Sequence, residues 1–223
     1  MSEGRAEETI AAYAALVRTY HRTLDLVSER GLEEFDRHLR DARAYARAIR
    51  GLAGERATVV DVGSGVGLPA VVVAAMLPEA RVILVERRRR RVAFLELAVA
   101  RLGLRGATVF AGDVRALTGV RADAVAAQAV ASLGDLVRLT RHLHGDPCFL
   151  LSRRGPGWRG ELPDVARALG VPLTWWDSGA AQGPSSEAAS GTAEAEVLEE
   201  PLETRGSLVA LRLPGGSACP SSG

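Results

Sequence analysis

A glycine-rich turn, Asp61–Pro69 (DVGSGVGLP), restricts the fold of this chain more than any other segment. It overlaps the end of a short β-branched run, Thr58–Val62, and leads into an apolar segment of helical length, Leu68–Leu77. A strand that stops at glycines just before a helix is typical of buried parallel strands, whose carboxyl ends face the ligand in α/β proteins. The segment therefore predicts a central strand, a tight turn and a helix beside a ligand site.

Strand and helix patterns alternate beyond this turn. We expect further strands at Val82–Glu86, Ala107–Asp113, Ala122–Val130 and Cys148–Ser152, and further helices at Arg88–Leu102, Leu133–Leu143 and Leu162–Leu169. A short TWW strand and a final hairpin, formed by AEVLEEPL and SLVALRL around Arg205 and Gly206, complete the pattern. Repeated strand–helix–strand units predict right-handed crossovers and an α/β fold with a mostly parallel sheet.

The first part of the chain has a helical pattern instead. Between Glu7 and Ile49, apolar positions recur at three- and four-residue steps, which indicates amphipathic helices. We expect a break between Leu24 and Gly31, where Ser28 can cap the second helix, and an end at Gly51 and Gly54. These patterns divide the chain into a helical extension at 1–56, a Rossmann-like domain at 57–213 and a disordered tail at 214–223.

Composition excludes several classes of protein. The 28 basic residues are all arginine and face 27 acidic residues, so the net charge of +1 is not that of a uniformly basic nucleic-acid-binding domain. The two cysteines, Cys148 and Cys219, have the spacing of neither a disulfide framework nor a zinc site. The charged N-terminus and short apolar stretches predict neither export nor a membrane span. We expect a cytoplasmic monomer that binds no metal and no membrane, with a mobile loop at Gln182–Thr192.

The turn has the chemistry of a nucleoside-type cofactor site. Its glycines, Gly63, Gly65 and Gly67, follow a GxGxG spacing, and Glu86 ends the next strand about 20 residues on, where a carboxylate accepts hydrogen bonds from a ribose diol. No Walker lysine is present, which favours S-adenosylmethionine over a nucleotide phosphate. We expect Asp61 and the three glycines to line this site and Asp113–Arg115 to lie near the adenine. The alternative is a glycine turn that serves packing only.

Several blocks resemble one known family. DVGSGVGLPA, VERRRRRVAFLELAVARLGL, AVASLGDL and FLLSRRG, together with the amino-terminal RTLDLVS and RHLRDA, resemble the bacterial small-subunit rRNA guanine-N7 methyltransferases, the RsmG or GidB family. The resemblance implies a class I methyltransferase fold with a seven-stranded sheet, the cofactor S-adenosylmethionine, and N7-methylation of a guanine in the decoding region of 16S rRNA. It implies 16S rRNA or the small ribosomal subunit as partner. By the same resemblance, the cofactor-contact positions are Gly63, Leu68, Val114, Arg115 and Gln128.

Three departures from that family concern the site. The family usually has arginine where this chain has Gln128, lysine where it has Arg153, and glutamate where it has Arg115. A neutral glutamine supplies neither the permanent charge nor the bidentate fork of arginine. Arg153 keeps the positive charge of the lysine, and Arg154 reinforces it. We interpret the chain as a divergent member, with Gln128 and Arg153 as its candidate catalytic residues.

Methyl transfer to guanine N7 needs alignment more than a general base, because N7 carries a free lone pair. The remaining candidates are therefore substrate-binding residues. Arg87, Arg88 and Arg91 are placed to bind RNA phosphates, with a solvated helix face as the alternative. His38 either faces the substrate or packs between helices.

Two further functions remain open at this point. The first is a small-molecule methyltransferase recruited from the rRNA family, which the near-neutral charge and Gln128 favour. The second is a cofactor-binding protein without catalysis, which would follow if Gln128 and Arg115 disable the site.

Overall fold

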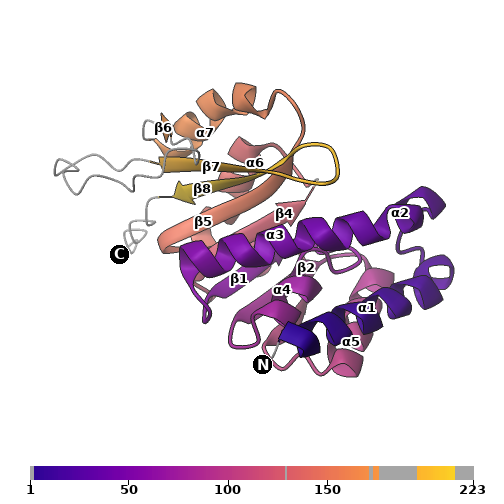
Figure 1. Cartoon of the computed structure of the whole chain (residues 1–223). Helices are drawn as coiled ribbons and strands as arrows, with labels where there is room; N and C mark the ends of the chain where they lie inside the picture. The colour runs from indigo at the N-terminus through magenta and orange to yellow at the C-terminus, as the bar shows by residue number, and fades with distance from the viewer. Residues whose placement is uncertain (1–2, 129, 171–172, 176–194, 214–223) are drawn as a thin grey trace.

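The chain forms one twisted sheet with helices on both faces, as a computed structural model shows for residues 3–128, 130–170, 173–175 and 195–213 (Figure 1). The α-helices are α1 (Glu3–Leu24), α2 (Glu29–Glu33), α3 (Phe35–Ala53), α4 (Ala70–Met76), α5 (Arg89–Leu102), α6 (Leu133–Thr140) and α7 (Leu162–Leu169). Short 3₁₀ turns lie at Val114–Ala116, Arg141–Leu143 and Trp158–Glu161. The strands are β1 (Thr58–Val62), β2 (Arg81–Glu86), β3 (Ala107–Ala111), β4 (Ala122–Gln128), β5 (His144–Arg154), β6 (Leu173–Trp175), β7 (Ala195–Pro201) and β8 (Ser207–Leu213).

The strand order explains where a ligand can bind. The sheet runs β3-β2-β1-β4-β5-β8-β7-β6, with β1 to β5 parallel and β8 antiparallel to both of its neighbours. The expected α/β sheet and final hairpin are confirmed, and the three-residue β6 makes the sheet eight-stranded rather than seven-stranded. Strands β1, β2 and β3 follow one another toward one edge of the sheet, whereas β4 lies on the other side of β1. The strand order therefore reverses between β1 and β4. In such sheets a crevice opens at this reversal, beyond the carboxyl ends of the strands.

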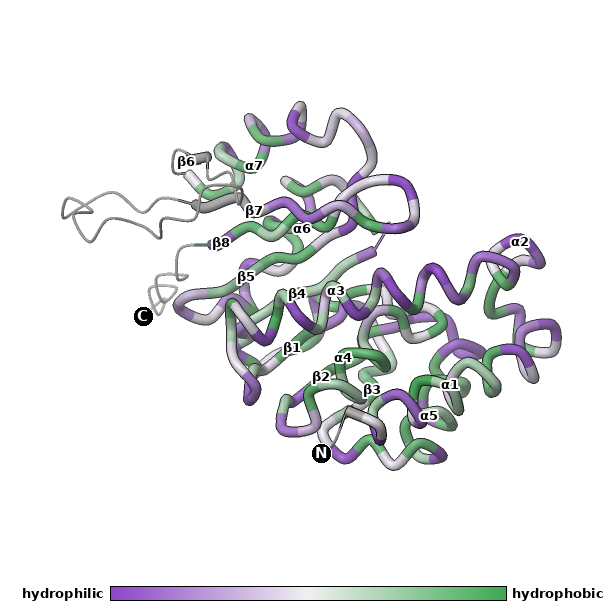
Figure 2. The backbone as a smooth tube through the Cα atoms, viewed as in Figure 1, coloured by the Kyte–Doolittle hydropathy of each residue, from purple (hydrophilic) through white to green (hydrophobic). Residues whose placement is uncertain are grey.

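Alternation along the strands divides the core into two layers. In β1, Val59 packs with α1, α3, α4 and α5 on one face, whereas Val60 and Val62 pack with α6 and α7 on the other. Both faces of the central strands are therefore apolar, as expected for a parallel sheet covered on both sides. Figure 2 shows this as hydrophobic strands flanked by helices that are hydrophobic on one side and hydrophilic on the other.

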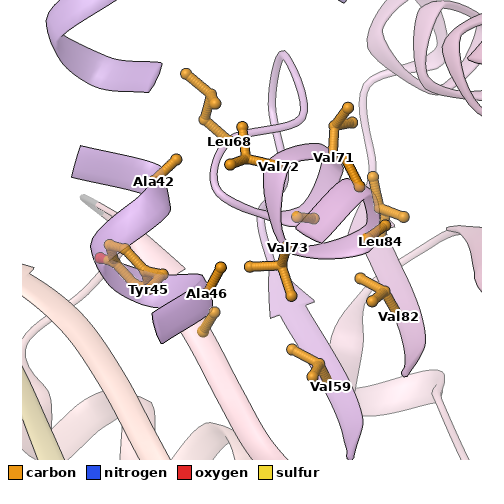
Figure 3. Close-up of a cluster of buried hydrophobic side chains, with 14 of the residues drawn as sticks. Ala42, Tyr45, Ala46, Val59, Leu68, Val71, Val72, Val73, Val82 and Leu84 are labelled. Atoms are coloured by element: carbon orange, nitrogen blue, oxygen red, sulfur yellow. The ribbon is translucent and has the colours of Figure 1, made fainter. Parts of the chain in front are cut away.

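The amino-terminal helices belong to the first of these layers. Tyr13 of α1 and Tyr45 of α3 are fully buried in the same apolar cluster as Val59 and the residues of α4. Figure 3 shows Ala46 of α3 facing Val73 of α4 across this cluster. The expected break is confirmed, since α1 ends at Leu24 and the Ser28 hydroxyl accepts a hydrogen bond from the Gly31 N–H at 3.1 Å. The helical extension thus covers the sheet and shares its core.

Some expected boundaries shift for local reasons. The helix expected from Leu68 begins at Ala70, because the glycine turn extends through Pro69. The strand expected to reach Asp113 ends at Ala111, because the Asp113 carboxylate accepts the Arg115 N–H and starts a 3₁₀ turn. The last residue of the TWW strand, the mobile loop and the disordered tail lie outside the described residues. No helix in the described part of the chain is long and apolar enough to cross a membrane.

A buried carboxylate joins α3 to the β7–β8 hairpin. Asp41, which is 3% exposed, accepts hydrogen bonds from the Glu203 N–H at 2.9 Å and the Thr204 N–H at 3.3 Å. The Thr204 hydroxyl donates to the same carboxylate. The contacts connect segments more than 160 residues apart in the chain. They hold the turn of the hairpin against the middle of α3.

A second buried carboxylate lies at the end of β1. Asp61 is 1% exposed, and its Oδ2 atom has no hydrogen-bond partner among the described residues. Burial raises the pKa of Asp61 from 3.8 to about 7, and the negative charge of Glu86 acts in the same direction. A buried acid of this kind destabilises the fold at the pH where it must ionise.

Replacing Asp41 with alanine should lower the free energy of unfolding by about 2–3 kcal/mol, because buried donors of Glu203 and Thr204 lose their acceptor. Urea unfolding measures this loss. The matched control is Asp36→Ala on the same helix, since Asp36 is exposed and makes only a surface ion pair with Arg18. Equal losses in the two variants would contradict the anchoring role.

Replacing Asp61 with asparagine should remove the part of the pH dependence of the free energy of unfolding that the titration of Asp61 causes. The folded chain binds more protons at Asp61 than the unfolded chain between about pH 4 and 7, so stability falls as the pH rises through this window. We expect Asp61→Asn to raise the free energy of unfolding at pH 8 by about 1–3 kcal/mol and to leave it nearly unchanged at pH 4. Urea titrations at the two pH values check this, and an unchanged pH profile would contradict it.

Candidate functional site

A cavity of about 450 Å³ opens beyond the carboxyl ends of β1, β2, β3 and β4. This is the edge where the reversed strand order predicts a ligand. The volume lies within the range of small-molecule and cofactor pockets. The cavity combines apolar walls with charged side chains, and its lining residues are Val62, Gly63, Val85, Glu86, Arg87, Arg88, Arg91, Gly112, Asp113, Val114, Arg115, Val130, Ala131 and Leu139.

The floor of the cavity is the glycine turn after β1. The N–H groups of Gly63 and Ser64 donate to the Val85 carbonyl at 2.9 and 3.0 Å, which ties the turn to the end of β2. Gly63 has a φ of 71°, and a Cβ atom there would lie 3.0 Å from Val130 Cγ2. Main chain rather than a side chain therefore forms the wall at this point, as expected for Gly63.

Gly67 is not among the residues that line the cavity. Its φ is 109°, and a Cβ atom there would lie 2.7 Å from Val71 Cγ2 and 3.2 Å from the Tyr13 hydroxyl oxygen. Tyr13 itself donates a hydrogen bond to the Val66 carbonyl at 2.9 Å. The space beside Gly67 is thus filled by the apolar core. The packing alternative holds for this glycine, whereas Gly63 faces the cavity.

Glu86 is the most strongly positioned group in the site. It is 6% exposed, and its Oε1 atom accepts the N–H groups of Arg87 and Arg88 at 2.7 and 2.8 Å. Its Oε2 atom accepts the Gly65 N–H at 3.0 Å. A carboxylate offers about four acceptor positions, so one remains free on a side chain that lines the cavity. Glu86 therefore connects the glycine turn to the start of α5 through hydrogen bonds. It still has one acceptor position for a ligand hydroxyl.

Asp113 follows β3, the neighbour of β2, and also lines the cavity. Its Oδ1 atom accepts the Arg115 N–H at 3.0 Å, and its Oδ2 atom lies 3.5 and 3.6 Å from the guanidinium nitrogens of Arg87 and Arg115. That N–H contact, followed by the two positive charges, lowers the pKa of Asp113. The structure brings Asp113, Val114 and Arg115 to the same cavity as Glu86, as expected.

Asp61, Leu68 and Gly65 lie outside the cavity lining. Asp61 points into the layer that contains α1 and α3, where it raises the pKa of the buried Tyr13 hydroxyl beyond the effect of burial alone. Leu68 is 9% exposed, and Figure 3 shows it at the edge of the apolar cluster. Gly65 takes part through its main-chain N–H, which bonds to Glu86.

Among the candidate catalytic and substrate residues, Arg87, Arg88 and Arg91 line the cavity, whereas the lining does not include Gln128, Arg153, Arg154 and His38. Gln128 and Arg153 are paired neighbours at the carboxyl ends of β4 and β5. Arg153 donates to the Arg205 carbonyl at 3.2 Å, and Arg154 lies 3.6 Å from Glu161 with its side chain 11% exposed. Burial lowers the pKa of the His38 ring, and the positive charge of Arg153 lowers it further. The structure groups His38 with Arg153 beside the cavity rather than within it.

Sequence reasoning missed the apolar walls. Val130, Ala131 and Leu139 line the cavity, and Val130 is 40% exposed. A flat apolar wall suits a stacked base. The block AVASLGDL, which contains Val130 and Ala131, was a signal for this region, but only the fold shows that Val130 faces Gly63.

The residues fit an adenosine-bearing group. The free acceptor of Glu86 suits a ribose hydroxyl, and the apolar walls suit a purine ring. In the described parts of the chain, no three His, Cys, Asp or Glu side chains gather where they could hold a metal ion.

Comparisons with known proteins agree with this geometry. The family model described as rRNA small subunit methyltransferase G (GidB) matches residues 6–163. A ribosomal RNA small subunit methyltransferase G from Neisseria meningitidis is 34% identical over 158 residues, which cover 70% of this chain and 74% of that protein. The protein of the same name from Erythrobacter litoralis is 35% identical over 161 residues, which cover 72% and 76%.

Solved structures show the same fold at low sequence identity. A putative O-methyltransferase from Klebsiella pneumoniae superposes with a TM-score of 0.55 at 11% identity, covering 91% of this chain and 89% of that one. Fibrillarin from Aeropyrum pernix, solved with S-adenosyl-L-methionine, gives a TM-score of 0.52 at 14% identity, covering 78% and 76%. With its class I methyltransferase fold and a family match over most of its length, this chain belongs to the rRNA small subunit methyltransferase G family.

Proposed function

We propose that this protein uses S-adenosylmethionine to methylate N7 of a guanine in the decoding region of 16S rRNA. The observation that carries the proposal is the combination of family membership with a cavity in which Glu86 retains one free acceptor. The relatives are named for the small ribosomal subunit RNA, and we extend that substrate class to this chain.

In this proposal the cofactor occupies the cavity. Glu86 accepts a ribose hydroxyl, and Asp113 with Val114 and Arg115 borders the adenine ring. The bare main chain at Gly63 lets the cofactor approach the turn closely. The bound cofactor supplies an electrophilic methyl group on a sulfonium sulfur.

The protein's part in the reaction is alignment. Guanine N7 forms the new bond to the methyl carbon with its own lone pair, and the pair of the broken carbon–sulfur bond stays on sulfur, so no side chain has to remove a proton. Holding the two atoms in line is worth several kcal/mol, of order 7 in favourable cases. Arg153, Arg154 and His38, at the ends of β5 and on α3, are placed to orient the substrate, and Gln128 lies between them and the cavity.

One observation favours a second candidate function. Gln128 stands where the family usually has arginine, and its neighbour on β5, Arg153, bonds to the Arg205 carbonyl instead of extending freely. A site that has lost a fixed cation near the substrate is weaker for RNA. The second candidate is therefore a small-molecule methyltransferase that evolved from the rRNA enzymes.

Replacing Glu86 with glutamine should weaken cofactor binding about 10–100-fold, because the ribose loses a charged acceptor and the amide presents an N–H to main-chain donors. Isothermal titration with S-adenosylhomocysteine measures this. The control is Glu96→Gln, an exposed glutamate on α5, which should bind as the original protein does. If Glu86→Gln binds equally well while thermal unfolding shows it folded, the ribose role of Glu86 is wrong.

The methyl acceptor is identified by transfer of labelled methyl groups from S-adenosylmethionine. We expect label in small subunits from a strain that lacks this mark, and N7-methylguanosine in the digested 16S rRNA. Label confined to small molecules of a cell extract would support the second candidate instead. Cofactor binding without any transfer would contradict both and indicate a non-catalytic protein.

A further inference from the structure

Only some of the arginines in the run after β2 line the cavity. Arg87, Arg88 and Arg91 line it, whereas Arg89 and Arg90, which belong to the same helical turn, do not. The i,i+3 spacing of Arg88 and Arg91 places both at one side of the helix start. A solvated helix face would show no such division. The cavity-lining members are therefore candidates for a ligand contact that Arg89 and Arg90 do not share.

Two of the cavity arginines remain without a countercharge. Asp113 lies within ion-pair distance of both Arg87 and Arg115. The Glu86 carboxylate accepts three main-chain N–H groups. Among the residues that the structure describes, no carboxylate forms an ion pair with Arg88 or Arg91. The guanidinium of Arg91 instead lies beside the glycine turn, 3.6 Å from where a Cβ atom of Gly65 would be.

The start of α5 adds positive potential at the same place. Arg88 is its N-cap residue and makes no side-chain capping bond, and the first turn contains no acidic residue. A helix start normally attracts negative groups because of its free N–H groups and macrodipole. Arginines at this position repel the helix dipole, so the arrangement is costly until an anion is present.

The cofactor does not neutralise this charge. Counting side chains, the cavity has four arginines against the two carboxylates of Glu86 and Asp113. S-adenosylmethionine carries a sulfonium, an ammonium and a carboxylate, and so adds one more positive charge. With the cofactor bound, the rim of the cavity therefore favours a second, anionic ligand, and the phosphates of RNA are anions of this kind.

We propose that Arg88 and Arg91 bind a backbone phosphate of the substrate RNA at the rim of the cofactor cavity, so that the RNA covers the bound cofactor. This inference rests on the proposed function. It implies an order of events: the cofactor enters before the RNA, and the demethylated cofactor leaves after it. Arg88 and Arg91 would thus bind substrate and retain the cofactor at the same time.

The test is the release rate of labelled S-adenosylhomocysteine, measured by chase with an excess of unlabelled compound. It is run with and without unmethylated small subunits, on the original protein and two variants. Arg88→Gln/Arg91→Gln removes the proposed contact. Arg89→Gln/Arg90→Gln is the matched control, because it removes the same charge from the same helical turn outside the cavity.

We expect the subunits to slow release at least tenfold for the original protein and for the Arg89/Arg90 control. For the Arg88/Arg91 variant, the release rates with and without subunits should be nearly equal, whatever the affinity of this variant for S-adenosylhomocysteine alone. Equal release with and without subunits in the original protein, or equal loss in both variants, would overturn the proposal. If the original protein still methylates the subunits in either case, the proposed function stands and only this inference fails. If it neither binds the cofactor nor transfers a methyl group, the proposed function fails and the inference with it.

A second measurement separates a phosphate contact from a change in folding. The dependence of RNA affinity on salt concentration reports the number of phosphates contacted, by about 0.7 in logarithmic slope for each contact to single-stranded RNA. The Arg88/Arg91 variant should lower this slope by about 0.7, because the two arginines share one phosphate. An unchanged slope would overturn the phosphate contact. Thermal unfolding should show both variants folded, since glutamine is a good helix former.

Discussion

The carboxylate of Glu86 holds the site together, because it bonds to main chain on both sides of the cavity. It accepts N–H groups from Gly65 in the turn after β1 and from Arg87 and Arg88 before α5. Buried carboxylates are stable as anions only when such donors surround them. The same bonds fix the turn, place the beginning of α5 and aim one free acceptor at the cavity. The positions of the glycine turn and of the arginine-rich start of α5 therefore depend on one side chain.

The charged side chains near Glu86 lie in two different environments. On the side of α1 and α3, the buried Asp61 is costly to ionise, and burial raises its pKa to about 7. On the open side, Arg87 and Arg115 are held by Asp113, whereas Arg88 and Arg91 are not paired with any described carboxylate. The difference is one of burial, since Asp61 is 1% exposed inside the layer of α1 and α3, whereas Arg88 and Arg91 stand at the start of α5 with at least part of their surface open to solvent. The acid that resists ionisation is therefore buried, and the two arginines without a described ion-pair partner line the open cavity.

Much of the fold and part of the site could be predicted from local patterns. The glycine turn, Glu86 and the triplet Asp113 to Arg115 were expected at one site, because the ends of neighbouring parallel strands must meet at one edge. The different surroundings of the glycines in the turn could not be predicted from the sequence. Gly67 fills a gap among Val71, Leu95 and Tyr13, and Tyr13 belongs to a helix more than 50 residues earlier. Spacing alone shows that a glycine is present, but it does not show which atoms crowd it.

Sequence patterns alone were enough to predict the alternation of strands and helices, the helical segment at the amino terminus, the position of the glycine turn and the family. Periodicity and glycine spacing are local properties, so they can be recognised in the amino-acid sequence alone. Only the tertiary structure decided which members of the run Arg87–Arg91 face the cavity, that Asp41 holds the hairpin turn around Thr204, and that Gln128 and Arg153 stand beside the cavity rather than in it. Those outcomes depend on how distant segments pack and how strands align. Packing and register join residues far apart in the chain, and no local pattern records them.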